Sequence, residues 1–265
     1  MTRMPTYFIS HGGGPWPWIP DMRRAFAPLE ASFKRLPSEL PAPPKAVLMI
    51  SGHWEEQDAF AVMHSANPPM VYDYSNFPPH TYEVTYPAPG APALAERVAA
   101  MIDAAGLPTR LDDTIGYDHG TFVPMAILWP NADIPLFQVS MRSTYAPDEH
   151  IALGRALAPL RDQGVLIIGS GLSYHNLREF GPRAQVPSDA FDTWLNTTLA
   201  LPAPDRTARL MDWESAPYAR DCHTREDHLV PLFSALGAAE DDTATRTYHD
   251  TMIFGGVTAS SWRFG

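Results

Sequence analysis

The sequence predicts an α/β fold, with a single domain in which helices flank a central, mainly parallel or mixed sheet. Short apolar runs rich in β-branched residues alternate with helical patterns of about 10 to 15 residues, which is typical of this class. Of the 265 residues, 45% are hydrophobic and 18% are charged, which is enough apolar material for one large core. Because no polar, flexible linker interrupts the pattern, we expect residues 1–265 to form one domain.

In the first half of the chain, strands and helices follow one another closely. Thr6–Ser10 is predicted as a strand, and a loop rich in Gly, Pro and Trp separates it from a helix over residues 21–36. Two further strands are expected at Ala46–Ser51, which is apolar enough to be buried, and at Ala59–His64. Residues 92–105 form an amphipathic pattern with Pro at its start and Gly behind its end, which predicts a helix.

The second half continues the alternation and closes with two strands. Strands are expected at Pro135–Met141 and Val165–Gly169, with a helix over residues 148–161 between them. Three helices then follow, at residues 188–200, 205–213 and 224–238. The closing strands are predicted at Thr245–Phe254 and Val257–Arg263.

Proline is unusually frequent, at 28 of 265 residues, with clusters at 41–44, 67–92 and 202–204. Proline fixes φ and removes a hydrogen-bond donor, so these segments are expected to be rigid, irregular loops.

Charge and cysteine content exclude several classes of protein. With 30 acidic and 19 basic residues the net charge is −11, which argues against nucleic acid or an anionic membrane as the main partner. The single cysteine, Cys222, excludes an intramolecular disulfide and a cysteine-based metal site. No apolar run is long enough to span a bilayer and no signal peptide is visible, so we expect a cytoplasmic protein. It is expected to be a monomer or a homodimer.

Three of the ten histidines stand in the loops that follow predicted strands. His11 follows Thr6–Ser10, His53 follows Ala46–Ser51, and His175 follows Val165–Gly169, each in a loop rich in Gly or Ser. In an open α/β sheet, ligands bind beyond the carboxyl ends of the strands, so the active site is expected there. Since imidazole binds Zn, Fe, Cu and Ni, the pattern predicts a three-histidine metal site, with ordinary loop or core histidines as the alternative.

Other side chains have weaker signals. His119 lies in a glycine-flanked loop and is expected to be a fourth ligand or a general acid/base, while His228 lies on the predicted helix 224–238. Trp16 and Trp18 are candidates for the wall of an aromatic pocket. The remaining histidines are expected at the surface or in loops: His64, His80, His150, His223 and His249.

Four motifs, which occur in this order along the chain, carry a resemblance to a known family. They are Ser10-His11-Gly12-Gly13-Gly14-Pro15, Ser51-Gly52-His53-Trp54-Glu55, Tyr117-Asp118-His119-Gly120-Thr121 and Ser173-Tyr174-His175-Asn176-Leu177. Together they resemble the class III extradiol ring-cleaving dioxygenases, in the branch of the 4,5-DOPA dioxygenase type. The similarity runs from Tyr7 to Gly265 and therefore covers nearly the whole chain.

The resemblance implies an α/β fold and a mononuclear Fe(II) site that opens a catechol-type ring with O2 to a muconic semialdehyde. His11, His53 and His175 would be the metal ligands, His119 the acid/base residue, and both His119 and His228 would contact the substrate, a small aromatic diol. Many class III relatives use two histidines and a glutamate. The third histidine present here leaves Zn(II) as a further candidate metal.

Glu55 is a candidate to orient a ligand imidazole. It stands two residues after His53 and could accept a hydrogen bond from an imidazole N–H. The alternative is a solvated loop carboxylate.

Three other functions compete with ring cleavage. His11-Gly12-Gly13-Gly14 resembles the oxyanion-hole motif of lipases, but the match to a nucleophile elbow, Gly171-Leu172-Ser173-Tyr174-His175, has the wrong last residue for a serine hydrolase. A zinc hydrolase using the same histidines and a non-enzymatic binding protein of the same superfamily are the other two.

Overall fold

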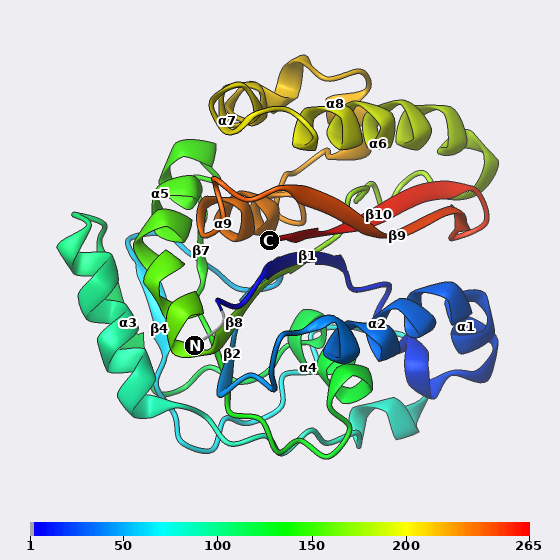
Figure 1. Ribbon diagram of the computed structural model, residues 1–265. Coiled ribbons are helices and arrows are strands. Elements are labelled where there is room, and N and C mark those ends of the chain that lie inside the picture. Colours follow the sequence, from blue (N-terminus) through cyan, green and yellow to red (C-terminus); the bar gives the residue numbers. More distant parts are fainter. Residues whose placement is uncertain (1–2) are drawn as a thin grey trace.

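Six strands form the central sheet of the computed structural model, which describes residues 3–265 (Figure 1). Their order across the sheet is β6 (Leu136–Gln138), β2 (Ala46–Ser51), β8 (Val165–Gly171), β1 (Thr6–Ser10), β10 (Val257–Phe264) and β9 (Ala244–Ile253). Strands β6, β2, β8 and β1 are parallel, whereas β10 and β9 are antiparallel to their neighbours. The predicted α/β fold with a mixed sheet is therefore confirmed.

Helices cover both faces of this sheet. Helix α9 (Val230–Gly237) packs on β8 and β1, and α6 (Gln185–Leu199) packs on β10. On the other side, α4 (His119–Leu128) contacts β2 and β8 (Figure 1). Every residue of β1, β2 and β8 is buried, as expected for parallel strands covered on both faces.

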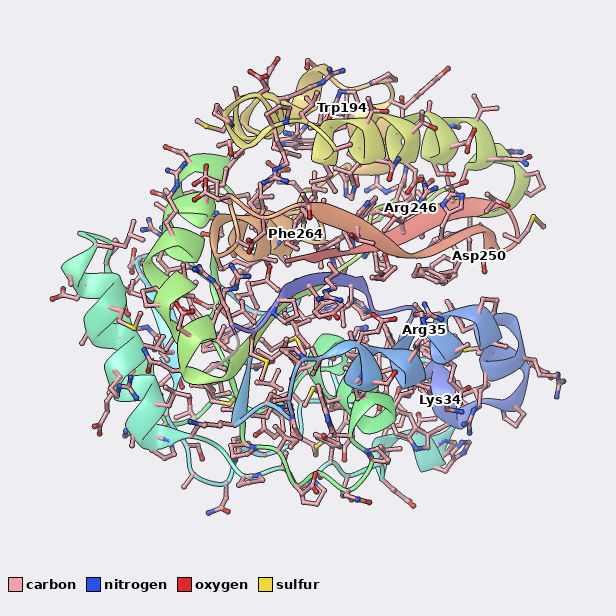
Figure 2. The ribbon with its side chains drawn as sticks, viewed as in Figure 1. Lys34, Arg35, Trp194, Arg246, Asp250 and Phe264 are labelled. Atoms are coloured by element: carbon pink, nitrogen blue, oxygen red, sulfur yellow. The ribbon has the colours of Figure 1, made fainter. Side chains whose placement is uncertain are left out.

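The edge strand β9 is covered by α2 (Ala27–Glu39). Arg35 of α2 donates a hydrogen bond to the Thr247 carbonyl oxygen at 2.8 Å, and Figure 2 shows Arg35 on the helix beside this edge. Covering and pairing an edge in this way protects it from association with other chains.

The other helices are α1 (Pro20–Ala25), α3 (Pro92–Ala104), α5 (Pro147–Leu157), α7 (Ala203–Met211) and α8 (Ala219–Cys222). Short 3₁₀ helices lie at Trp16–Trp18, Pro79–Tyr82, Ala158–Gln163, Gly181–Arg183 and Trp213–Ser215. Within residues 3–265, no helix is long and apolar enough to cross a membrane.

Two small parallel pairs extend the structure beside β6. They are β3 (Glu55–Glu56) with β7 (Met141–Arg142), and β4 (Phe60–Met63) with β5 (Thr109–Asp112). The strand predicted at Pro135–Met141 is thus divided between the central sheet and a small pair.

Several predicted helices have different limits, mostly because of proline. The helix expected over 21–36 is broken at Phe26, just before Pro28 restarts it as α2. The helix expected over 148–161 changes to a 3₁₀ helix at Ala158, before Pro159. The helix expected over 224–238 begins only at Val230, so His228 precedes it.

Two of the histidines assigned to the surface or to loops are in fact in the core. His150 and His223 are fully buried, on α5 and just after α8. Each buried ring has a hydrogen-bonding partner: His150 Nδ1 donates to Ala146 O at 2.8 Å, and His223 Nε2 lies 3.1 Å from Ser173 O. The assignment was wrong for His150, which lies within a helix, whereas His223 does lie in a loop but is buried there. Satisfied backbone hydrogen bonds allow both imidazoles to be buried.

His150 is expected to make stability fall at acidic pH. Its Nε2 accepts the Arg142 N–H at 3.1 Å, and burial lowers its pKa to about 4. Because the unfolded chain binds this proton near pH 6.5, the contribution is complete above that pH and is lost as pH falls towards 4.

The test is denaturant unfolding of wild-type protein and His150→Gln at pH 7.5 and 4.5. The stability advantage of the wild type should shrink by about 2 to 3 kcal/mol between these pH values. An advantage of equal size at both would contradict the account.

Candidate active site

The strand order brings the predicted ligand histidines to one edge of the sheet. Strands β2, β8 and β1 are adjacent and parallel, so their carboxyl ends lie side by side. His11, His53 and His175 follow these ends and line one cavity of about 440 Å³, together with His119 and His228. This volume lies in the range of small-molecule sites, about 300 to 1,000 Å³.

The loop that carries His11 is held by Trp16. The Trp16 indole N–H donates to the His11 carbonyl oxygen at 2.9 Å. Gly12 between them has φ of +87°, and a Cβ there would lie 2.6 Å from the indole nitrogen, so glycine is required. Trp16 is fully buried, and neither Trp16 nor Trp18 lines the cavity. The expectation that they form its wall is therefore wrong.

The second close approach is between β8 and the segment before α9. A Cβ on Gly171 would lie 2.0 Å from the His228 carbonyl oxygen. The Leu172 N–H donates to that same oxygen at 3.0 Å. The absence of a side chain at Gly171 thus lets His228 reach the strand ends.

The five imidazoles lie against one another in two groups. His11, His53 and His119 offer ring nitrogens within 4.8 Å of one another, and His175 forms a second group with Asp227 and His228. The Nε2 atoms of His11 and His53 are 3.3 Å apart, and those of His53 and His228 are 3.1 Å apart. The His175 ring stacks on His228 with centroids 3.4 Å apart. His228 therefore lies between His175 and the other predicted ligands.

Asp73, which sequence reasoning missed, holds two of these imidazoles. Its Oδ1 is 2.8 Å from His119 Nδ1, its Oδ2 is 3.0 Å from His53 Nδ1, and it also accepts the His119 N–H at 3.0 Å. Burial raises the pKa of the Asp73 carboxyl, but the hydrogen bonds from His119 and His53 outweigh burial and hold it well below its usual range. An ionised carboxylate only accepts, so both Nδ1 atoms are donors.

Asp227 has the corresponding place beside His175 and His228, and it too was missed. Its Oδ1 lies 3.3 Å from His175 Nδ1 and accepts the His228 N–H at 3.0 Å. Burial raises the pKa of this carboxyl, but its contacts with His175 and His228 outweigh that effect and keep the pKa far below the usual range. Asp227 could have been found from the sequence because it stands next to His228. Asp73 lies in the proline-rich loop, where no motif marks it.

The surroundings keep most of these imidazoles neutral. Burial lowers the pKa of His11 and His228 well below the usual value and that of His119 to about 4. At His53 burial also lowers the pKa, but the hydrogen bond and charge of Asp73 outweigh it and the pKa is raised. Positive charge is therefore favoured on the His53 ring, whose Nε2 would have to lose its proton before it could bind a metal ion.

These residues fit a divalent metal ion. Nδ1 of His53 and of His119 is bonded to Asp73, which leaves the Nε2 atom of each ring to bind a metal ion. Histidines that bind metals are commonly held by a carboxylate in the same way. The 3.3 Å between Nε2 of His11 and His53 suits neighbouring ligands of one ion, which lie about 3.0 to 3.4 Å apart for bonds of about 2.1 Å.

His119 begins a helix and does not lie in a loop as predicted. Asp118 is the N-cap of α4, and its side chain accepts the Thr121 N–H at 3.0 Å. The ring of His119 is edge-on to that of His11, with centroids 5.3 Å apart. The helix was missed because it contains Gly120 and Pro124, which are typical of loops.

The structure does not support the serine hydrolase. Ser173 is buried, and its Oγ accepts the N–H of Ser260 in β10 at 2.9 Å. Ser173 does not line the cavity, so its hydroxyl is not presented to a substrate.

Glu55 does not hold a ligand imidazole, contrary to the sequence prediction. It lies in β3, and its Oε2 is 2.6 Å from the Arg225 guanidinium. His53 donates from Nδ1 to Asp73 instead. The prediction failed because pairing of β3 with β7 turns Glu55 away from the cavity.

Replacing Glu55 and Asp73, each by its amide, gives a matched test. Glu55→Gln is expected to leave metal binding and turnover near the wild-type level, since an exposed ion pair contributes little. Asp73→Asn should weaken metal binding or activity by about 10- to 100-fold, because it removes the acceptor for two imidazoles. Metal titration and kinetics on both variants check this, and equal effects would contradict it.

Comparison with known proteins identifies the family of this chain. Residues 6–265 match the family model described as the catalytic LigB subunit of aromatic ring-opening dioxygenase. A 4,5-DOPA dioxygenase extradiol of Beta vulgaris is 35% identical, over 98% of this chain and 96% of that protein. The protein of the same name in Escherichia coli K12 is 32% identical, over 89% and 86% of the two chains.

Two further comparisons point the same way. The dioxygenase tasH of Hapsidospora irregularis is 35% identical, over 95% of this chain and 84% of that one. The crystal structure of an uncharacterized protein from Escherichia coli K12 superposes with a TM-score of 0.79 at 27% identity, over 99% of this chain and all of that one. On the match across residues 6–265 and on these relatives, the chain belongs to the LigB family of class III extradiol dioxygenases and is an enzyme of that type.

Proposed function

We propose that this enzyme is a metal-dependent extradiol dioxygenase that opens a catechol-type ring with O2 and yields a muconic semialdehyde. The observation that carries the proposal is the cluster of imidazoles at the ends of β1, β2 and β8, with Nδ1 atoms held by Asp73 and Asp227. Fe(II) is the proposed native metal, with Zn(II) as the alternative, and His11, His53 and His175 are the proposed ligands. The bound metal would supply the place where the diol oxygens and O2 meet.

His119 is the proposed general acid/base. Because its Nδ1 donates to Asp73 and its pKa is lowered to about 4, Nε2 is free of a proton at pH 7 and can accept one from a substrate hydroxyl. The protonated ring, stabilised by the Asp73 carboxylate, can then return the proton as the ring opens. His228, whose neutral Nε2 lies 3.1 Å from that of His53, is the proposed contact to the diol.

We further propose that residues 1–265 act as one catalytic domain in the cytoplasm. The single cysteine, Cys222, is free and buried, which is compatible with a reducing compartment. Whether the enzyme is a monomer or a homodimer stays a prediction.

The proposal is tested by loading metal-free enzyme anaerobically with Fe(II) or Zn(II) and then adding a panel of catechols with O2. O2 uptake and a yellow ring-opened product with Fe(II) would support it. Hydrolysis of ester substrates by the Zn(II) form without O2 uptake would favour the zinc hydrolase. Tight catechol binding without turnover in any metal form would favour the non-enzymatic binding protein.

A further inference from the structure

Resting on the role proposed for His119, we propose that Ser51 and Asp118 are positioning residues, which fix the distance between the imidazoles of His119 and His53. Neither Ser51 nor Asp118 lines the cavity, so both would act through the two histidines and not on the substrate. A series of buried hydrogen bonds between the end of β2 and the start of α4 supports this assignment.

The hydrogen bonds join the two elements that carry these histidines. Ser51 is the last residue of β2, and Asp118 is the N-cap of α4, immediately before His119. The Ser51 hydroxyl donates to Asp118 Oδ1 at 2.7 Å and accepts the His53 N–H at 3.2 Å. The same carboxylate oxygen accepts the Thr121 N–H at 3.0 Å. Ser51 thus links the backbone of His53 to the residue that precedes His119.

These hydrogen bonds are shielded from water. Ser51 is 1% exposed and Asp118 is 4% exposed. A buried polar group that loses its partner is unfavourable, because no water can replace the lost bond. The pair therefore resists any displacement of the first turn of α4 relative to the end of β2.

Close packing acts in the same direction as the hydrogen bonds. A Cβ on Gly120 would lie 2.5 Å from Ser51 Oγ and 2.8 Å from Cδ2 of His53, so α4 begins in direct contact with the end of β2. The Ser170 hydroxyl, near the end of β8, donates to the Gly120 carbonyl oxygen. The ring centroids of His53 and His119 are 3.9 Å apart as a result.

Asp73 has a different part in this arrangement. Its carboxylate holds Nδ1 of both rings and so orients them, but it belongs to a loop, whereas Ser51 and Asp118 hold the backbones at the ends of regular elements. Proton transfer requires donor and acceptor within about 2.6 to 3.2 Å, and a misplacement of about 1 Å can lower a rate about 100-fold. The position of the His119 backbone should therefore matter for turnover.

The test compares kinetics and metal content of Fe(II)-loaded variants with a catechol. Ser51→Ala and Asp118→Ala should lower kcat by about 10- to 100-fold, with KM and metal content near the wild-type values, because the proposed ligands are intact. Unchanged kcat in both variants, or loss of metal in step with kcat, would overturn the inference.

The conservative variant Asp118→Asn separates hydrogen bonding from charge. Asparagine keeps an acceptor oxygen for Ser51 and Thr121, and within residues 3–265 Asp118 Oδ2 has no hydrogen-bonding partner to lose. This variant should therefore keep kcat close to the wild-type value. A loss as large as in Asp118→Ala would show that the charge and not the bonds matters, and would overturn the inference.

Thr6→Val is the matched control for loss of stability. It also removes a buried hydroxyl, which donates to Ala235 O at 2.8 Å and joins β1 to α9, but Thr6 does not line the cavity. It should lower thermal stability to a similar extent as Ser51→Ala and leave kcat unchanged. A fall of kcat in Thr6→Val as large as in Ser51→Ala would mean that lost stability alone slows the enzyme, and would overturn the inference.

A measurement without substrate separates this inference from ring cleavage. In Zn(II)-loaded enzyme labelled with ¹⁵N-histidine, NMR follows the exchange with water of the His119 Nδ1 proton, identified by its absence in His119→Gln. Exchange should be faster in Ser51→Ala and Asp118→Ala than in wild type, Asp118→Asn and Thr6→Val. Equal exchange in all of them would overturn the inference. Absence of ring opening by the wild-type enzyme would contradict the proposed function alone.

Discussion

Replacing His11, His53 or His175 with alanine is expected to remove most of the bound metal and all ring-cleaving activity. Each residue follows one of three adjacent parallel strands and lines the same cavity. Loss of one imidazole from a site with three leaves too few ligands to hold the ion in place. The effect should therefore exceed that of replacing His119 or Asp73.

The measurement is metal content by elemental analysis, together with turnover, for each of the three variants. His64→Ala is the control, because His64 also bonds carboxylates but lies outside the cavity. If one of the three variants keeps full metal occupancy and turnover, that residue is not a ligand. His175 is the most informative of the three, because in this structure it groups with Asp227 and His228.

His119→Gln is expected to keep metal near the wild-type level and to lose turnover by about 10²- to 10⁴-fold, the usual contribution of a general acid/base. Glutamine keeps much of the volume of the side chain but cannot take up a proton at neutral pH. The fall should appear in kcat and to the same extent in kcat/KM, as expected for a group that acts in the transition state.

Two other outcomes would contradict the assignment of His119 as the general acid/base. Its ring nitrogen lies within 4.8 Å of ring nitrogens of His11 and His53. Loss of metal in step with activity would therefore indicate that His119 is a ligand. Parallel loss of thermal stability would indicate a structural role, since His119 is tied to Asp73 through its ring and its backbone. Metal analysis and thermal melting beside the kinetics distinguish these outcomes.

The central sheet could be predicted from the sequence because its strands are strongly apolar and short. Ala46–Ser51 is identical in prediction and structure, and β8 extends Val165–Gly169 by only two residues. The elements that were missed have mixed signals: β5 reads Thr-Arg-Leu-Asp and is partly exposed, and α4 is apolar around its whole surface. Periodicity cannot identify such segments, since burial on one face is what creates the pattern.

For the site, residues at strand ends could be predicted and their partners could not. His11, His53 and His175 follow predicted strands, and ligands in α/β proteins bind beyond the carboxyl ends of the strands. Asp73 reaches His119 across 46 positions, and only the folded loop brings them together. Glu55 shows the opposite error: it is close to His53 in sequence, but β3 directs it to Arg225.

Identification of the product formed from a catechol by the Fe(II)-loaded enzyme tests the central claim most directly. The account predicts a semialdehyde heavier than the substrate by the mass of one O2, with the ring opened beside the diol and one O2 consumed for each catechol. A muconic dicarboxylic acid, which requires cleavage between the two hydroxyl carbons, or a quinone without added oxygen would contradict it.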